Sequence, residues 1–186
     1  GYGKEYSQDL VGDIARSFRT LNYKSDLLNS TLLRELPTSV YELHWWNLID
    51  IADYCINTSG TTTVVVLPLL FNEVWKWIPD MRSGYAAKAL KLAGEVSSIV
   101  DSRTQRALIR AIPRSLDKLH PNVVAESIVA AARVGYTPRL RYGKKYGSLF
   151  YRRLERRLVM GDGLGHIPLE RVSADLIVQV VQSLKG

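Results

Sequence analysis

Apolar residues recur along this chain at a helical spacing, and the helical segments themselves return at a nearly constant interval. Equivalent apolar faces begin at Leu10-Val11, Leu48-Ile49, Ala86-Ala87 and Val123-Val124, which are 38, 38 and 37 residues apart. A fifth pair, Leu176-Ile177, follows after 53 residues. Paired helices at a fixed period indicate an α-solenoid, in which each unit buries its apolar face against its neighbours. A compact all-α domain with evenly sized helices is the alternative.

The expected fold is therefore all-α, as an α-solenoid of four to five helix pairs with a period near 38, in one domain over residues 1–186. The helix pairs are expected at 7–36, 41–78, 83–116 and 120–160, with a partial last unit at 168–186. Segment 61–78 is ambiguous, because β-branched residues from Thr61 to Val66 favour a strand whereas Leu70, Val74 and Trp77 keep a helical spacing. We expect a helix from about residue 63, since no neighbouring segment offers a partner strand.

Local signals predict where several of these helices begin and end. Ser7 is a candidate N-cap, and Ser102 with Gln105 forms a capping-box pattern. Pro37 is expected to end the second helix. Pro121 suits a first helical turn, and Gly135 suits the end of the same helix. The helices that begin near Leu10 and Val123 also end alike, in Leu21-Asn22-Tyr23 and Val134-Gly135-Tyr136.

The composition excludes several classes of protein. With 46% hydrophobic residues, four Trp and only 13 Gly and 7 Pro among 186 residues, the chain is neither disordered throughout nor collagen-like. The single cysteine, Cys55, excludes an internal disulfide framework, and a buried structural thiol is expected. No apolar run reaches the ~20 residues that a membrane span needs.

No arrangement of side chains predicts catalysis. The three histidines have no metal-ligand spacing with one another or with Cys55. Asp50 and Asp53 are expected to form a solvated acidic edge of a helix. The glycine-rich segment from Gly161 to Gly165 follows a helix and lacks the lysine of a phosphate-binding loop, so it is expected to connect repeats. The chain is therefore not expected to be an enzyme or to hold a cofactor or metal.

Charge is distributed unevenly along the chain, whose formal net charge is +7. Residues 1–80 carry six basic and ten acidic side chains, whereas residues 133–157 carry nine basic and one acidic. A basic stretch of this kind is typical of a surface for an anionic partner.

Two helices place arginines on one side and apolar residues on the other. On a helical wheel of ~3.6 residues per turn, Arg103, Arg106, Arg110 and Arg114 fall within about 80°, opposite Leu108, Ile109 and Ile112. On the second helix Arg152, Arg153, Arg156 and Arg157 share one side, and Phe150, Leu154 and Leu158 share the other. The loop before it adds Arg139, Arg141, Lys144 and Lys145, interleaved with Tyr136, Tyr142, Tyr146 and Tyr151. Guanidinium groups among aromatic rings suit phosphates and unstacked RNA bases. A solvated basic face, or one paired with an acidic partner protein, is the alternative.

The segment from His120 to Tyr136, which reads HPNVVAESIVAAARVGY, resembles the first helix of heptatricopeptide and octatricopeptide repeats. It is also similar to the repeats found upstream of RAP domains in organellar RNA-binding proteins. The segment Ile167 to Ile177 looks like the start of another such repeat. The resemblance implies a mitochondrial matrix or plastid protein that contacts RNA. The 53-residue spacing departs from the family period, and no RAP domain follows, so no activity of that domain carries over.

The sequence thus predicts a non-catalytic RNA-binding helical-repeat protein in an organellar ribonucleoprotein or ribosome, where it holds rRNA alongside other proteins. A protein–protein scaffold subunit of a large organellar complex, such as a respiratory complex, is the second interpretation, and an RNA-processing enzyme is the third.

Trp45 and Trp46 point about 100° apart on a helix, so at least one is expected to leave the core and serve as a protein-interface anchor.

Overall fold

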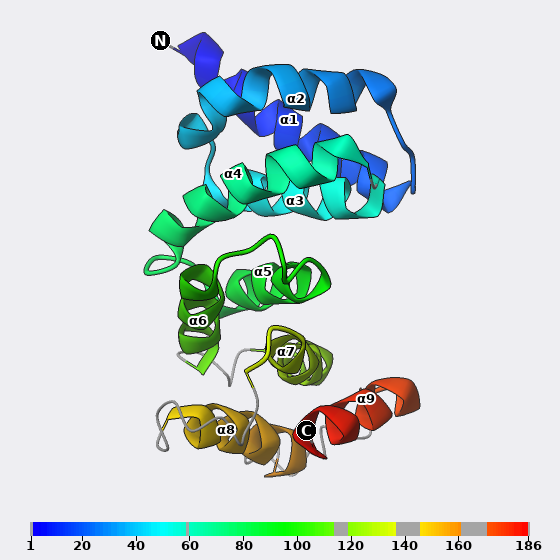
Figure 1. Ribbon diagram of the computed structural model, residues 1–186, viewed down its shortest axis with the longest axis vertical. Helices are drawn as coiled ribbons and strands as arrows, with labels where there is room; N and C mark the ends of the chain where they lie inside the picture. Colours follow the sequence, from blue (N-terminus) through cyan, green and yellow to red (C-terminus); the bar gives the residue numbers. More distant parts are fainter. Residues whose placement is uncertain (1, 59, 114–118, 137–145, 161–170, 186) are drawn as a thin grey trace. The chain divides into compact units, whose positions relative to one another are not determined.

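The computed structural model describes residues 2–58, 60–113, 119–136, 146–160 and 171–185, and no β-strand occurs among them. The predicted all-α class is confirmed (Figure 1). The elements are α1 (Tyr2–Thr20), α2 (Asp26–Ser39), the 3₁₀ helix η1 (Val40–Glu42), α3 (Trp45–Thr58), α4 (Thr61–Trp77), α5 (Ser83–Glu95), α6 (Ser102–Ala111), α7 (Pro121–Arg133), α8 (Tyr146–Met160) and α9 (Ala174–Lys185).

The ambiguous segment 61–78 is helical, as its apolar spacing predicts. Helix α4 begins at Thr61, and its buried side chains include Val66, Leu70 and Val74, which lie one turn apart. Pro68 lies inside this helix with its ring in solvent. Burial of one continuous apolar stripe therefore outweighs the strand preference of the β-branched residues.

The expectation that Pro37 ends the second helix is wrong, because α2 continues to Ser39 and passes directly into η1. The proline lies in the last turn, where the hydroxyls of Thr38 and Ser39 each donate to the carbonyl oxygen of Glu35 at 2.9 Å. The Val40 N–H in turn donates to the Leu36 carbonyl. Together these hydrogen bonds hold the last turn in place, although Pro37 has no backbone N–H to donate.

One predicted helix start is also wrong. Helix α1 begins at Tyr2, so Ser7 lies inside it rather than at its N-cap. At α6, the helix begins at Ser102, as predicted; the Asp101 carboxylate accepts from the N–H groups of Arg103 and Thr104, and the Gln105 amide donates to the Ser97 carbonyl oxygen at 3.0 Å. A carboxylate is a stronger acceptor of the exposed N–H groups than a hydroxyl, and it favours the positive end of the helix dipole.

Helices α1 and α7 end in the same hydrogen-bonded turn. The Gly135 and Tyr136 N–H groups donate to the carbonyls of Ala132 and Ala131, both at 2.9 Å, and Gly135 has a φ of 75°. In the same way, the N–H groups of Asn22 and Tyr23 donate to the carbonyls of Arg19 and Phe18, with Asn22 at a φ of 51°. Both are Schellman turns in which a tyrosine follows the left-handed residue.

The chain divides into two compact units. The first comprises residues 1–80 and 98–104, where α3 packs against α1 and α4, and α2 packs against α4. Its core includes Leu32, Leu48, Ile51, Tyr54 and Leu67, all at most 1% exposed. Gly12 lets α1 approach α3 closely, since a Cβ there would lie 2.7 Å from Asn47 Cγ.

The second unit comprises residues 81–97 and 105–186, where α7 packs against α5, α8 and α9. Its core includes Leu90, Leu108, Ile112, Ile128 and Leu154, each fully buried. At the contact of α5 with α7, a Cβ on Gly94 would lie 3.3 Å from the Ala130 backbone. Small residues therefore set the distance between these two helices.

The repeated apolar positions are buried in three of the four evenly spaced helices. Leu48, Ala86 and Val124 are 0% exposed. Leu10, where the apolar face of the first helix is predicted to begin, is 57% exposed, so the prediction is wrong at this residue. The close approach of α1 to α3 at Gly12 directs small residues, Gly12 and Ala15, toward the core instead of Leu10.

Candidate nucleic-acid interface

Helix α6 presents three of its predicted arginines to solvent. Arg103, Arg106 and Arg110 are exposed, whereas Leu108, Ile109 and Ile112 on the other side are at most 2% exposed. The fourth predicted member, Arg114, lies outside the described residues. This helix begins at its Asp101 cap and exposes a continuous basic face because its apolar side is fully used in packing.

Arg103 differs from the other arginines of α6. Its guanidinium carbon lies 3.9 Å from the centre of the Trp75 ring, within the first unit. A cation over an indole face is attracted by the ring quadrupole. Arg103 is therefore oriented by Trp75, a contact between residues that are distant in the sequence.

Helix α8 presents a second basic face in the second unit. Arg152, Arg153 and Arg156 are exposed, while Phe150, Leu154 and Leu158 are buried. The predicted fourth arginine, Arg157, is only half-buried rather than fully presented. On the helical wheel it lies about 20° from Phe150, at the edge of the packed side. The phosphate-accessible set on α8 is therefore Arg152, Arg153 and Arg156.

A group of aromatic rings joins the end of α7 to the start of α8. The Tyr136 ring centre lies 5.9 Å from that of Phe150, edge to face, and 6.2 Å from that of Tyr151 with a 21° interplanar angle. The Tyr151 hydroxyl donates a hydrogen bond to the Tyr136 carbonyl oxygen. Tyr151 itself is 3% exposed, and burial raises the pKa of its hydroxyl. Tyr151 therefore serves in packing, and Tyr136 is the half-buried ring of the pair.

Arg110 of α6 lies close to this aromatic group. Burial raises the pKa of the Tyr136 hydroxyl, and the positive charge of Arg110 lowers it in part. An electrostatic effect of this kind requires the two groups to be near each other. Arg110 of α6 and Tyr151 of α8 thus both lie near Tyr136 within the second unit.

Part of the predicted basic surface lies outside the residues that the structure describes. These residues are Arg139, Arg141, Tyr142, Lys144 and Lys145. Tyr146 is the first residue of α8, and the glycine-rich segment 161–165 also lies outside the described part of the chain.

The predicted interface tryptophans belong to an aromatic cluster of the first unit. Trp46 is 37% exposed and stacks on His44, with ring centres 3.3 Å apart, while Trp45 is half-buried. His44 also contacts the Trp77 ring at 4.7 Å. As the helical geometry requires, one of the two adjacent tryptophans leaves the core.

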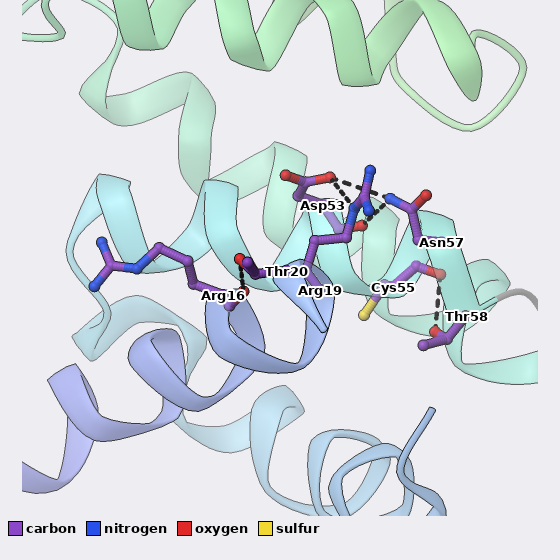
Figure 2. Close-up of polar contacts among 7 residues, drawn as sticks. All are labelled: Arg16, Arg19, Thr20, Asp53, Cys55, Asn57 and Thr58. Carbon is purple, nitrogen blue, oxygen red and sulfur yellow. Dashed lines mark hydrogen bonds and ion pairs between the residues drawn. The ribbon is translucent and has the colours of Figure 1, made fainter. Parts of the chain in front are cut away.

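The expectation of a solvated acidic edge at Asp50 and Asp53 is wrong. Figure 2 shows Arg19 of α1 reaching Asp53, with its Nε 3.0 Å from Asp53 Oδ1, and Asn57 donating to the same carboxylate oxygen at 3.1 Å. The Asp50 carboxylate is 8% exposed and lies 3.8 Å from Arg16. The two carboxylates therefore connect α3 to α1, and spacing along one helix carries no information about a partner 34 residues away.

Cys55 is fully buried, as predicted. Burial raises the pKa of its thiol to about 12.

Among the described residues, no group of three or more His, Cys, Asp or Glu side chains could hold a metal ion. In the same part of the chain, no helix is both long and apolar enough to cross a membrane.

A groove of about 260 Å³ between α5, α7 and α9 was not predicted from the sequence. Its walls include two cations, Lys91 and Arg133, and two anions, Glu126 and Asp175. Lys91 Nζ lies 2.9 Å from Glu126 Oε1 across the helices. Because carboxylates line it, this groove does not favour phosphate, and the arginine faces of α6 and α8 remain the best candidate for an anionic partner.

The comparisons with known proteins show no relationship. No protein-family model matches this chain, and no curated protein or solved structure is significantly similar to it.

Proposed function

We propose that this chain is a non-catalytic RNA-binding protein whose exposed arginines on α6 and α8 contact RNA phosphates. The observation that carries the proposal is that α6 and α8 each expose arginines opposite a buried apolar side, with Arg110 of α6 near Tyr136, whose ring packs against Phe150 and Tyr151 of α8. Exposed arginines on two helices offer the RNA backbone several cations, and each phosphate that they neutralise adds to the affinity through counterion release.

The charge of the second unit supports this proposal. The second unit carries eighteen basic and seven acidic side chains, and the first carries seven basic and eleven acidic. The exposed residues of the α8 face are arginines, whose planar guanidinium donates two hydrogen bonds to one phosphate. Contacts to phosphates position an RNA without selecting its sequence, so binding of limited sequence preference is expected.

The proposal includes an α-solenoid with a period near 38 residues. In its favour, alternate helices pack together inside each unit: α1 on α3 and α2 on α4 in the first, and α5 on α7 and α7 on α9 in the second. The shared Schellman turns after α1 and α7, 113 residues apart, are a second sign of repetition. Helix pairs that contact only their neighbours would produce both features.

The resemblance of residues 120–136 to organellar RNA-binding repeats supports a place in a mitochondrial ribonucleoprotein or ribosome, with rRNA as the ligand. Plastids are the other compartment that the resemblance implies. The setting is testable by expressing the full precursor with a fluorescent tag. Localisation outside both organelles would reject the compartment and leave the RNA-binding surface to be judged by itself.

The decisive experiment changes the α8 face in the full chain. The triple variant Arg152→Glu, Arg153→Glu, Arg156→Glu should weaken binding to single-stranded RNA by orders of magnitude. Because each phosphate contact on a single strand contributes about 0.7 to the salt dependence, loss of three contacts should reduce the slope of log K against log salt by about 2. Titrations at several salt concentrations measure both effects, and circular dichroism checks that the helices persist.

Glu155 provides a matched control on the same helix. It is the only acidic residue among residues 133–157 and is exposed beside the arginines. Glu155→Gln removes a charge that repels phosphate, so affinity at low salt should rise. If the triple variant keeps the affinity and salt slope of the wild type, RNA does not bind this face.

A protein–protein scaffold is the second candidate function, and the surface of the first unit favours it. Leu21, Tyr23 and Leu27 are 73%, 56% and 78% exposed, which makes them suitable contacts for another protein. If RNA binding is unmeasurable at low salt and replacement of Leu21 and Leu27 by Ser releases a protein partner, the scaffold function replaces the RNA-binding one.

A further inference from the structure

Tyr136 is held in place by three independent contacts. Its N–H donates to the Ala131 carbonyl at 2.9 Å in the turn made by Gly135, and its own carbonyl accepts from the buried Tyr151 hydroxyl. Its ring meets Phe150 edge to face. A ring that is already ordered loses little conformational entropy when a flat ligand stacks on it.

One arginine lies near this half-buried ring, and another follows its packing partner on α8. Arg110 acts on the Tyr136 hydroxyl from α6, and Arg152 follows Tyr151 directly on the exposed side of α8. Duplex RNA keeps its bases stacked on each other, whereas single strands and loops offer free base faces. An aromatic ring with arginines nearby suits a strand that carries an unpaired base between two phosphates.

We propose that Tyr136 stacks an unpaired RNA base while Arg110 and Arg152 hold the neighbouring phosphates, so that the surface selects single strands or loops over duplex RNA. This inference rests on the proposed RNA-binding function and adds the form of RNA that the site accepts.

The chain contains a natural control for this role. Tyr23 occupies the same position after α1 that Tyr136 occupies after α7, with the same turn and a ring that contacts Phe18 at 5.1 Å. It belongs to the acidic first unit. Tyr23 shares the backbone geometry of Tyr136. Arg19 and Lys24 lie beside it, but Arg19 is paired with Asp53, so replacing Tyr23 should leave RNA binding unchanged.

The test uses three probes on the full chain: a short single-stranded oligoribonucleotide, the same strand with abasic sugars, and its duplex. Wild-type protein should prefer the base-bearing strand over the abasic strand by at least about fivefold, the lower range of aromatic–base stacking. Tyr136→Leu, which keeps apolar packing against Phe150, should lose this preference while its affinity for the abasic strand persists. Tyr136→Phe and Tyr23→Leu should keep it.

The outcomes separate the inference from the function on which it rests. If Tyr136→Leu still prefers the base-bearing strand, the stacking role is overturned and phosphate binding stands. If the variant loses affinity for the base-bearing and abasic strands equally, Tyr136 has only a packing role, and the inference is again overturned. If wild-type protein binds none of the three probes at low salt, both the proposed RNA-binding function and this inference are rejected.

Discussion

The Asp101 carboxylate organises the start of α6, the helix that carries the first arginine face. It accepts hydrogen bonds from the N–H groups of Arg103 and Thr104 at 2.8 and 3.0 Å and from the Thr104 hydroxyl at 2.5 Å. Burial tends to raise the pKa of this carboxyl, but the hydrogen bonds from Thr104 and Arg103 outweigh it and lower the pKa below the ordinary value. Asp101 therefore favours the folded state in its charged form.

Asp101→Ala should lower the free energy of unfolding by about 1 kcal/mol, as is usual for loss of an N-cap. The pKa is lower in the folded state, so this stabilisation is complete above the pKa of the unfolded chain and is lost as the pH falls through the folded pKa. Urea denaturation at neutral and acidic pH should show the gap between wild type and variant narrowing in acid. Asp101→Asn should retain much of the cap, and a gap independent of pH would contradict this account.

The Cys55 thiol is a reporter of opening in the first unit. It is 0% exposed, and burial raises its pKa to about 12, so the reactive thiolate is scarce at neutral and mildly alkaline pH. A thiol-specific reagent should therefore modify native protein slowly and urea-unfolded protein at once. Rapid modification of native protein would show that the interior around Cys55 opens without global unfolding.

At the scale of the helices, small residues decide how closely neighbours pack. Gly94 on α5 faces the Ala130 backbone of α7, and Gly12 on α1 faces Asn47 of α3. In both pairs the contacting helix has no room for a further methyl group. Interior packing at native density does not absorb such a group without shifting the backbone.

Gly94→Ala should lower the free energy of unfolding by about 1–3 kcal/mol, the usual cost of overpacking. Gly84→Ala is the matched control on the same helix, because its Cβ would meet Leu119 at 3.8 Å, an ordinary contact. That change should be neutral or raise the free energy of unfolding by up to about 1 kcal/mol. Chemical denaturation followed by circular dichroism compares the two variants. Equal effects would show that the α5–α7 contact accommodates a further methyl group.

At the scale of the whole molecule, charge and aromatic residues are divided between the two units. All four tryptophans lie between residues 45 and 77, in the acidic first unit, whereas the α8 arginine face belongs to the basic second unit. Tryptophan fluorescence therefore reports on the first unit, and RNA binding is expected to report on the second. Substitution of the carboxylates of α3 should destabilise the first unit without changing RNA binding by the second.

Asp53→Arg should shift the fluorescence-monitored urea transition to lower concentration, because it removes the contacts to Arg19 and Asn57 and leaves like charges facing each other. RNA affinity and salt slope of the folded variant should equal those of the wild type. Asp26→Asn, an exposed carboxylate of α2, should change neither. Loss of RNA affinity in folded Asp53→Arg protein would extend the RNA site on the first unit beyond Arg103.

Much of the helical structure follows from the sequence alone. The spacing of Leu70 and Val74 places α4, and Pro121 with Gly135 brackets α7, as predicted. The exposed arginines of α6 and α8 also follow from the period of the helix, since alternation between apolar and basic residues is a local property. Local signals are sufficient where a feature depends only on the order of residues along one helix.

Other features depend on residues that are distant in the chain, and only the tertiary structure decides them. The exposure of Leu10, the pairing of Asp53 with Arg19, and the placement of Tyr136 between Arg110 and Tyr151 each result from helices meeting in space. Spacing along one helix says which side is apolar but not what lies opposite. The partner is chosen by close packing between helices, and a residue as small as Gly12 can rotate the buried face away from the most hydrophobic side chains.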